Sequence, residues 1–449
     1  MRFLPRTSRS QEILNLAGPA IAGLLSQTIV SIVDTAMVGR LENAQVSLAA
    51  MGLAVLASWA ITSFFSSFST GTHVLVARRH GESKPIEAGE VLNNSLLVSL
   101  IVGVIVGAIG YLFSYDVIGF VAKDSAVGRA GAGYMEYRFL GLPFFLFVVS
   151  YRGFFFGIGH TKVFMFSAII FNVSNIVLDY LFIFGALGFP QMGLAGAGLA
   201  NAVSSVAGWL FFLVVSLFPG YRRVYKYFSH FKLSREVLAQ IVRISIPVSL
   251  QNILILIGFL LFVAITGIIG TTAQAASQVV IAALFASFMP CFGLGIAAQT
   301  LVGQMLGRGH QKRAQLYGFE TAKLGTIFTV IVGCIFVVVP DAVLDVITTN
   351  AEVLHAARPV LQIAGVAQVF YGGGIILAHA LQAGGATVYV MAVEVLTHWI
   401  IFLPLTYLFG ITLGWGIQGA WMALPIYIVM YTLMNYLKFR SPGWTRFRI

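Results

Sequence analysis

Residues 219–243 read PGYRRVYKYFSHFKLSREVLAQIVR, the longest basic polar stretch in a chain that is otherwise apolar. On either side of it, long apolar runs alternate with short charged or turn-rich breaks. A helix that crosses a bilayer needs about 20 apolar residues. Six runs of that size precede the stretch and six follow it. The sequence therefore predicts twelve transmembrane helices, divided at the midpoint of the chain.

The composition supports a membrane protein. Of the 449 residues, 58% are hydrophobic and 10% are charged, and the mean hydropathy is +0.90. Soluble domains are about 45–50% apolar and about 25% charged, so a soluble chain of this composition could not cover its own surface. Runs such as Ser95–Gly110 do not alternate as the strands of a membrane barrel do. The predicted fold class is all-α and polytopic, with the lipid bilayer as its solvent. The twelve spans are predicted near residues 13–37, 48–76, 92–114, 134–156, 163–185, 193–218, 238–268, 275–305, 317–340, 360–381, 388–409 and 416–437.

The two halves resemble each other, which indicates a duplicated six-helix unit. Four anchors recur in the same order: Leu16–Pro19 with Ile244–Pro247, Leu75–Gly81 with Leu301–Gly307, Gly159 with Gly384, and Gly193–Ala197 with Gly416–Ala420. Six spans return the chain to its starting side, so the copies have parallel topology, related by a pseudo-two-fold axis along the membrane normal. We predict an N-lobe of residues 1–220 and a C-lobe of residues 221–449.

The net charge of +11 is a topology signal. If twelve spans alternate, 21 of the 27 lysines and arginines lie on the side of the termini, and five lie on the other. Cytoplasmic loops carry the excess of lysine and arginine. We therefore expect both termini in the cytoplasm and the protein in the cell (inner) membrane. No basic groove interleaved with aromatic residues remains to indicate nucleic acid as a partner.

Motifs of enzymes are absent from the sequence. It contains no H-E-x-x-H, no G-x-S-x-G and no Walker A pattern. Gly414–Gly419 matches G-x-G-x-x-G, but no strand precedes it. The two cysteines, Cys291 and Cys334, fall inside predicted spans and do not indicate a disulfide framework. We expect neither an enzyme nor a bound cofactor, and the energy for transport must come from an ion gradient or a partner.

Three acidic residues lie well inside predicted spans, where an ionised side chain costs about 2.5–3.5 kcal/mol. Asp34 in the first span and Asp179 in the fifth lie at a similar depth, toward the outer side. Both belong to the same six-helix lobe and could share a cavity. Glu394, in the eleventh span, lies nearer the cytoplasmic end, where its side chain can extend to water.

Amides accompany the two aspartates at helical spacing. Asn175 and Asn172 share a helix face with Asp179, and Gln27 lies two turns before Asp34. Asn201 interrupts the small-residue sixth span. Converging carboxylate and amide oxygens can coordinate Na⁺. They can equally hold a proton on a desolvated carboxyl with a like-charged neighbour. The amides can also serve only as hydrogen bonds between helices.

Other candidate residues concern the substrate and a hinge. Arg152, near the inner end of the fourth span, could line the cavity, although such a side chain more often caps carbonyls or extends toward water. Pro19 and Pro247 occupy matched positions in the first span of each half and can act as hinges. The candidate cavity residues are Gln27, Met37, Arg152 and Asn172.

These residues resemble the multidrug and toxic compound extrusion (MATE) transporters over nearly the whole chain. The resemblance is carried by Val33–Arg40, Tyr151–Gly153 with Gly157 and Gly159, Asn175–Gly185, Gly193–Ala197, and Gln299–Gln304 with Gly307. It implies a monomeric twelve-helix antiporter that exports organic cations or amphipathic drugs in exchange for inward H⁺ or Na⁺. By position, Asp34, Asn175 and Asp179 match the family's N-lobe cation or proton site. Asn201 stands where many members have threonine.

One branch of that family also uses an acidic pair in the seventh and tenth spans. Here those spans read Gln251-Asn252 and Tyr371-Gly372, without a carboxylate. The chain therefore resembles the DinF-like branch, which is coupled through its N-lobe alone, with bending of the first span near Pro19. A flippase for a lipid-linked precursor is the alternative function. It would need cationic cavity residues for a pyrophosphate, and only Arg152 could serve.

Overall fold

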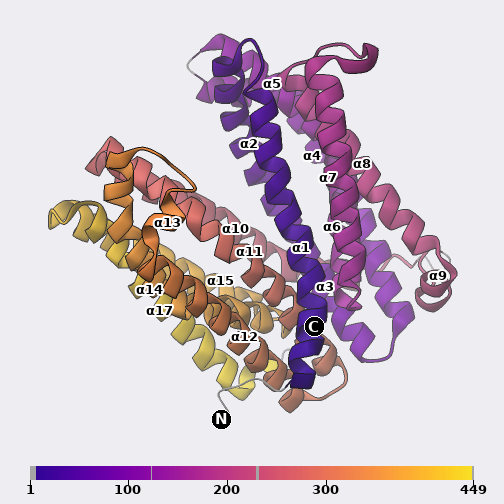
Figure 1. Ribbon diagram of the computed structural model, residues 1–449. Helices are drawn as coiled ribbons and strands as arrows, with labels where there is room; N and C mark the ends of the chain where they lie inside the picture. Colours follow the sequence, from indigo (N-terminus) through magenta and orange to yellow (C-terminus); the bar gives the residue numbers. More distant parts are fainter. Residues whose placement is uncertain (1–6, 123, 229–231, 447–449) are drawn as a thin grey trace. The chain divides into compact units, whose positions relative to one another are not determined.

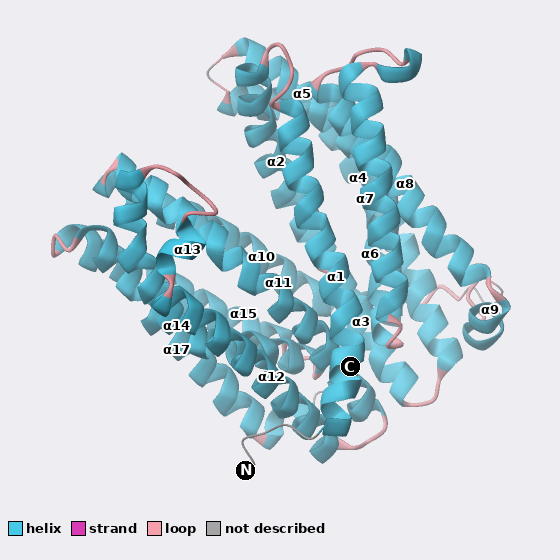
Figure 2. Ribbon diagram, in the orientation of Figure 1, coloured by secondary structure: helices cyan, strands magenta, loops and turns pink. Residues whose placement is uncertain are grey.

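The computed structural model describes residues 7–122, 124–228 and 232–446. Within these ranges the chain is almost entirely helical and contains no strand, as Figure 2 shows. Eleven helical segments are long and apolar enough to cross a membrane, and a bent pair of helices brings the number to twelve. The predicted all-helical membrane fold is confirmed.

The helices are bounded as follows. The α-helices are α1 (Thr7–Val38), α2 (Ala44–Ser66), α3 (Phe68–Gly81), α4 (Pro85–Val121), α5 (Ser125–Leu140), α6 (Leu142–Gly157), α7 (Thr161–Phe184), α8 (Leu194–Leu217), α9 (Pro219–Tyr225), α10 (Arg235–Ile269), α11 (Thr271–Gly307), α12 (Gln311–Val338), α13 (Pro340–Leu344), α14 (Ala351–Ala383), α15 (Thr387–Val395), α16 (Leu403–Tyr407) and α17 (Gly416–Arg440). The 3₁₀-helices are η1 (Ala186–Gly188) and η4 (Pro442–Arg446), and the π-helices are η2 (Leu396–Phe402) and η3 (Leu408–Thr412).

Each predicted span coincides with one helix or with a run of helices. The eleventh consists of α15, η2, α16 and η3, and two others are interrupted. The second consists of α2 and α3, which meet at Ser67, and the fourth consists of α5 and α6, which meet at Gly141 with a bend of 51°. Pro143, two residues into α6, has no backbone N–H to continue the α5 ladder. The bend therefore has a local cause in the sequence.

The chain forms two compact units, and Figure 1 shows their helices. One runs from Ala22 to Ser249 and is called the N-unit here. The other joins the chain up to Ile21 with the chain from Leu250 onward and is called the C-unit. These limits differ from the predicted division at residue 220, because the first helix of each half is shared between the units.

The start of each shared helix packs on the unit that does not contain its end. On α1, Ile13 and Ala17 are fully buried in the C-unit core, which also includes Leu301. On α10, the Ser249 hydroxyl donates to the carbonyl of Phe64 in the N-unit at 2.6 Å. In both helices the change of unit follows two residues after the matched proline, Pro19 or Pro247. The duplication is thus visible in how the units are divided.

The duplication also appears in the backbone where helices end. Helix α3 is stopped by Ser83 with φ 60°, and α11 is stopped 226 residues later by Gly309 with φ 74°. In both cases the next residue donates its N–H to the carbonyl five residues before it, from Lys84 to Arg79 and from His310 to Met305. This is the Schellman stop, in which glycine is the usual left-handed residue. The second copy has the favoured residue and the first does not.

We therefore expect Ser83→Gly to stabilise the protein by up to about 1 kcal/mol. A left-handed conformation costs an L-residue about 1–2 kcal/mol, and the greater freedom of glycine in the unfolded chain offsets part of the gain. Thermal unfolding of the detergent-solubilised protein would measure the difference. Ser83→Ala keeps the left-handed strain and serves as the control. A lower unfolding midpoint for Ser83→Gly than for Ser83→Ala would contradict the expectation.

The last span of each half lies unusually close to the span before it. A Cβ atom built on Gly196 of α8 would lie 2.6 Å from the carbonyl oxygen of Phe182 on α7. A Cβ atom built on Gly419 of α17 would lie 2.6 Å from the carbonyl oxygen of Phe409 in η3. Small residues at such positions let helix backbones approach in membranes. The matched sequence anchors Gly193–Ala197 and Gly416–Ala420 therefore have the same packing role.

Candidate functional site

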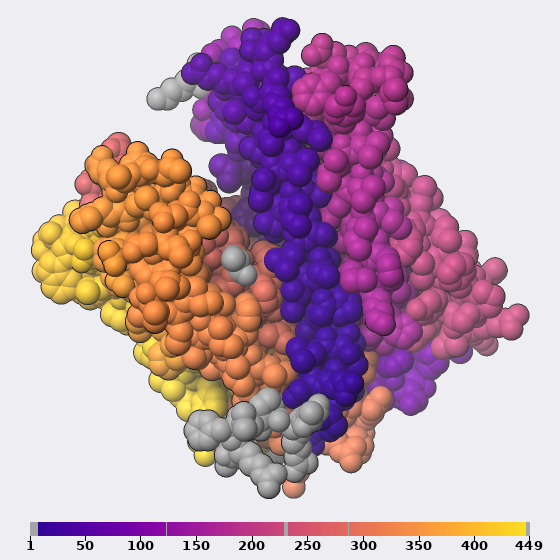
Figure 3. Space-filling model, in the orientation of Figure 1, coloured from indigo at the N-terminus to yellow at the C-terminus, as the bar shows by residue number. Residues whose placement is uncertain are grey.

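In the N-unit, α1 lies along α7, and the two helices are joined by polar side chains. Asn172 of α7 donates from Nδ2 to the Ser26 hydroxyl of α1 at 2.7 Å, and Ser26 donates to the carbonyl of Gly23 at 2.8 Å. Gly23 leaves room for the ring of Phe164 on α7. The α1 atoms, indigo in Figure 3, lie at the surface of the molecule, and Ile32 is 66% exposed. This pairing brings the outer part of α1 beside the acidic face of α7.

Asp34, Asn175 and Asp179 form one polar cluster, as the sequence predicted from their depth and spacing. Asn175 and Asp179 are almost completely buried, and Asn175 donates from Nδ2 to Asp179 Oδ2 at 2.9 Å. The Asp34 carboxyl lies within hydrogen-bonding reach of the Asp179 carboxyl. Oδ1 of each aspartate is buried and has no donor among the described residues. Two carboxylates cannot donate to each other, so the pair requires a proton or a cation between them.

A positive charge that is not among the predicted site residues also acts on this cluster. Arg138 of α5 is the charged neighbour of Asp34. Its guanidinium donates from Nη1 to the Tyr134 hydroxyl at 2.7 Å, and its Cζ lies 5.6 Å from the centre of that ring. Two ionised carboxylates and one guanidinium carry a net charge of −1, so one further positive charge would neutralise the cluster. In the sequence, the predicted depth of Arg138 in the fourth span is similar to that of Asp34 in the first. Equal depth could therefore have indicated Arg138 as a neighbour of Asp34.

Three other predicted site residues do not join the hydrogen bonds of this cluster. Asn201 is half-buried on α8, and in the part of the chain that the structure describes no hydrogen bond connects its side chain with the aspartates. Gln27 is exposed on α1, where its neighbour Ser26 makes the bond to α7 instead. Met37 is half-buried against the apolar core of the N-unit. Their proposed roles thus rest on position alone.

Arg152 is half-buried on α6 and points at the junction between α2 and α3. Its Nε donates to the Ser69 hydroxyl at 3.3 Å, and its Nη2 donates to the carbonyl of Ser66 at 3.4 Å. A helix end leaves carbonyl groups without partners. Arg152 therefore supplies hydrogen-bond donors to the polar groups at the interruption of the second span. Capping of carbonyls is the predicted alternative to contact with substrate.

Pro19 lies inside α1, which is helical from Thr7 to Val38 without interruption. Proline removes one hydrogen bond from the helical ladder and crowds the preceding turn. The site of this weakness lies two residues from the point where α1 passes from the C-unit to the N-unit. Its use as a hinge remains a prediction.

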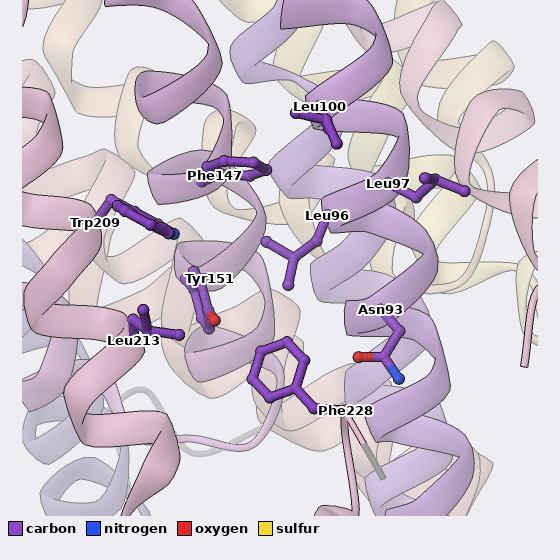
Figure 4. A pocket seen from close by; sticks show the side chains of 9 residues that line it. All are labelled: Asn93, Leu96, Leu97, Leu100, Phe147, Tyr151, Trp209, Leu213 and Phe228. Atoms are coloured by element: carbon purple, nitrogen blue, oxygen red, sulfur yellow. The ribbon is translucent and has the colours of Figure 1, made fainter. Parts of the chain in front are cut away.

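The cavity shown in Figure 4 is separate from the polar cluster. It lies in the N-unit, has a volume of about 280 Å³, and is lined by side chains of α4, α6 and α8 together with Phe228. Figure 4 shows Trp209, Leu213 and Phe147 around it. No residue of the predicted coupling site lines this cavity. Its lining is apolar apart from Asn93 and Tyr151 and contains no carboxyl or imidazole group that could carry a coupling proton.

The carboxyl cluster therefore has the features of a monovalent-cation or proton site. The described residues contain no group of three or more histidine, cysteine, aspartate or glutamate side chains that could hold a metal ion such as zinc. Two acids, one amide and one arginine can instead take up a single proton between the acids. The same oxygens suit a Na⁺ ion.

The MatE family model matches the chain twice, at residues 19–181 and 247–408. The matches begin at Pro19 and Pro247, 228 residues apart. The "Probable multidrug resistance protein NorM" of Thermotoga maritima is 26% identical over 445 residues, covering 97% of this chain and 93% of the relative. The NorM protein of Pseudomonas aeruginosa is 26% identical and covers 94% of this chain and 87% of the relative.

Solved structures show the same fold. A MOP superfamily transporter from Pyrococcus furiosus superimposes with a TM-score of 0.88 at 21% identity, covering 96% of this chain and 95% of that chain. A MATE structure in the straight conformation superimposes with a TM-score of 0.89 at 22% identity, again covering 96% and 95%. At this level of identity the structures support the architecture and not the site.

Proposed function

The chain belongs to the MatE family, and from that membership we propose that it is a secondary active efflux transporter. It is a multi-pass membrane protein and a transporter, not an enzyme. Relatives named as multidrug resistance proteins support drug efflux as its activity. The substrates would be organic cations or amphipathic compounds, exported from the cytoplasm in exchange for inward H⁺ or Na⁺. Both termini would lie in the cytoplasm.

One observation carries the proposed coupling: Asp34 and Asp179 are close neighbours on two helices, and Oδ1 of each is buried without a donor. A buried acid pair with one nearby arginine is electrically incomplete, because two negative charges face one positive charge. A proton or a Na⁺ ion bound between the acids would remove the imbalance. We infer that this bound ion is the coupling ion, with Asn175 positioning Asp179.

Exchange then follows from linkage. An ion at the acid pair must lower the affinity for substrate, and substrate must lower the affinity for the ion by the same factor. Couplings of this kind are typically about 1–3 kcal/mol, or roughly 5- to 150-fold in affinity. Release of the ion into the cytoplasm would favour binding of substrate there, and its rebinding from outside would favour release.

The alternative of a lipid-linked precursor flippase has less support. Its pyrophosphate substrate would require cationic side chains directed at a cavity. The guanidinium of Arg152 is directed instead at Ser66 and Ser69, which belong to the second span. No specific observation favours the flippase over the exporter.

Proteoliposomes loaded with a fluorescent organic cation would test the proposal. Efflux should follow an imposed pH gradient, an imposed Na⁺ gradient, or both, and the effective gradient would name the coupling ion. Addition of an ionophore that collapses the gradient should stop the efflux, and liposomes without protein provide the background. The absence of driven efflux under both gradients, with insertion of the protein verified, would contradict the proposal.

A further inference from the structure

Of the three acidic residues that lie well inside predicted spans, Glu394 of α15 is the one that the proposed coupling does not use. Its position near the end of the span predicts that the side chain extends toward water. The structure corrects this expectation, because Glu394 is only 5% exposed. Its carboxyl points into the C-unit, toward helices α10 and α17. A buried carboxyl at this position needs another explanation.

The carboxyl is surrounded by neutral hydrogen-bond donors. The hydroxyl of Tyr427 on α17 donates to Oε1 at 2.5 Å, and Nε2 of Gln251 on α10 donates to Oε2 at 3.5 Å. The Tyr431 hydroxyl, one turn after Tyr427, is also within hydrogen-bonding reach. Donors that point at a carboxylate favour its charged form. They also disfavour a metal cation, since a cation is bound by lone pairs and not by N–H or O–H groups.

Two polar atoms beside the carboxyl lack partners. Oε1 of Gln251 is buried and accepts no hydrogen bond within the described residues, although the residue is 7% exposed. Nδ1 of His398 is likewise unpaired there and lies 3.9 Å from Glu394 Oε1, too far for a hydrogen bond. The imidazole itself packs against Gly258, where a larger side chain would collide with it. A buried polar atom without a partner costs free energy, and a proton on the Glu394 carboxyl would give the Gln251 oxygen a donor.

Among the residues that the structure describes, no opposite charge compensates the carboxyl. The side chains that face Glu394 or its immediate partners from the surrounding helices are Gln251 of α10, Cys291 of α11, Tyr371 of α14, His398 of η2, and Tyr427 and Tyr431 of α17. In the described parts of the chain, neither lysine nor arginine is among the groups that act on this carboxyl. A buried acid without a cationic partner is stable as an ion only while its donors remain in place.

The helix itself is irregular directly after Glu394. The α-helix gives way to π-helical turns over Leu396–Phe402, which include His398. Pro404 follows in α16 and cannot donate a backbone hydrogen bond. π-helical turns inside α-helices occur frequently at functional sites. The irregular turns thus begin two residues after the buried acid.

We propose that Glu394 is a second proton-binding group, located in the C-unit, and that Tyr427 and Gln251 position it. The site accommodates both protonation states. The charged form accepts from the Tyr427 hydroxyl and the Gln251 amide. When a proton binds, rotation of the Gln251 amide turns its unpaired oxygen toward Glu394, and the carboxyl becomes the donor. His398, with Nδ1 3.9 Å from Glu394 Oε1, is the nearest side chain with a basic nitrogen and would relay the proton.

Infrared difference spectroscopy tests the site without relying on transport. The full-length protein would be labelled with ¹³C at the glutamate side-chain carboxyl, placed in lipid nanodiscs and titrated with acid. We expect a protonated-glutamate carbonyl band from Glu394, in addition to those of the other glutamates that take up protons in acid, and Glu394→Gln should remove this band alone. Glu320→Gln is the matched control, because Glu320 is also buried but pairs with Lys323 at 3.4 Å. That substitution should leave the band unchanged.

A second variant keeps the carboxyl and tests its positioning. Tyr427→Phe removes a donor that stabilises the charged form, so the proton should bind more tightly. The midpoint of the band should move to higher pH by about one to two units, the equivalent of a hydrogen bond to a charged group. An unchanged or lower midpoint would overturn the positioning role. A carboxyl that remains ionised at every pH and responds to Na⁺ would overturn the proton site.

The role of this proton in exchange rests on the proposed function, and a transport measurement addresses it separately. In proteoliposomes, Glu394→Gln should lower the number of protons exchanged per substrate by one. An unaltered ratio would mean that the site does not take part in exchange. If the wild-type protein showed the infrared band but no gradient-driven efflux, the proposed function would fail while the proton site remained.

Discussion

Asp34→Asn is expected to abolish gradient-driven efflux while leaving the protein folded and inserted. Asparagine has nearly the shape of aspartate but cannot carry the charge or the proton that the pair with Asp179 requires. Substrate affinity should then no longer depend on the coupling ion, and the roughly 5- to 150-fold difference expected of such linkage should fall to one. Efflux from proteoliposomes and binding of a fluorescent cation at two pH values or two Na⁺ concentrations would measure both effects.

Asp124→Asn provides a matched control in the same unit. Asp124 is exposed and caps the start of α5 by accepting the N–H of Ala126 at 2.8 Å. Asparagine is an equally good cap, so this variant loses a carboxyl without losing structure and should transport at the wild-type rate. Driven efflux by a well-inserted Asp34→Asn protein would refute coupling through Asp34.

The second large effect is structural. Gly196→Ala should destabilise the protein by about 2–3 kcal/mol or prevent its folding, because the new methyl group would lie 2.6 Å from the backbone carbonyl of Phe182. A backbone atom cannot rotate away, so α7 and α8 must separate, and overpacking of this kind costs about 1–3 kcal/mol or more. Since Asn175 and Asp179 lie on α7, separation of these helices should also disturb the carboxyl cluster.

Gly208→Ala, three turns further along α8, distinguishes close approach from loss of glycine itself. The nearest atom to a methyl group there would be 3.6 Å away, an ordinary contact. Alanine is about 1 kcal/mol better than glycine inside a helix, so this variant should be neutral or slightly more stable. Yield of monodisperse protein and thermal unfolding would compare the two. A Gly196→Ala protein as stable as Gly208→Ala would show that the helices are free to separate.

The sequence predicted the spans because hydropathy and length are strong signals in lipid. The predicted spans are too short at both ends, however, because the polar first and last turns of the helices extend beyond the apolar part. Helix α4 runs from Pro85 to Val121, whereas the apolar run was placed at residues 92–114. The repeat was found at nearly the right register: the left-handed glycine that matches Gly159 is Gly385, one residue after the one chosen.

The polar site could be predicted only from the spacing of residues along one helix and from their depth in the membrane. Spacing along one helix correctly joined Asn175 with Asp179, and equal depth joined both with Asp34. Contacts between distant segments could not be found in this way, because lipid-facing and core-facing surfaces are both apolar and the sequence does not show which helix faces which. For this reason the surroundings of Glu394, which include a tyrosine 33 residues later, were misjudged.

The division of α1 and α10 between the units has a consequence for the connectivity of the protein. The chain passes from one unit to the other at two points only, between Ile21 and Ala22 and between Ser249 and Leu250. Both crossings are in the interior of a helix, and the basic stretch at the midpoint of the sequence is not one of them. A chain severed within that stretch would keep both crossings intact. The two units are therefore connected covalently through the interior of two helices. The basic stretch at residues 219–243 looks like a linker in the sequence, but it connects helices within the N-unit.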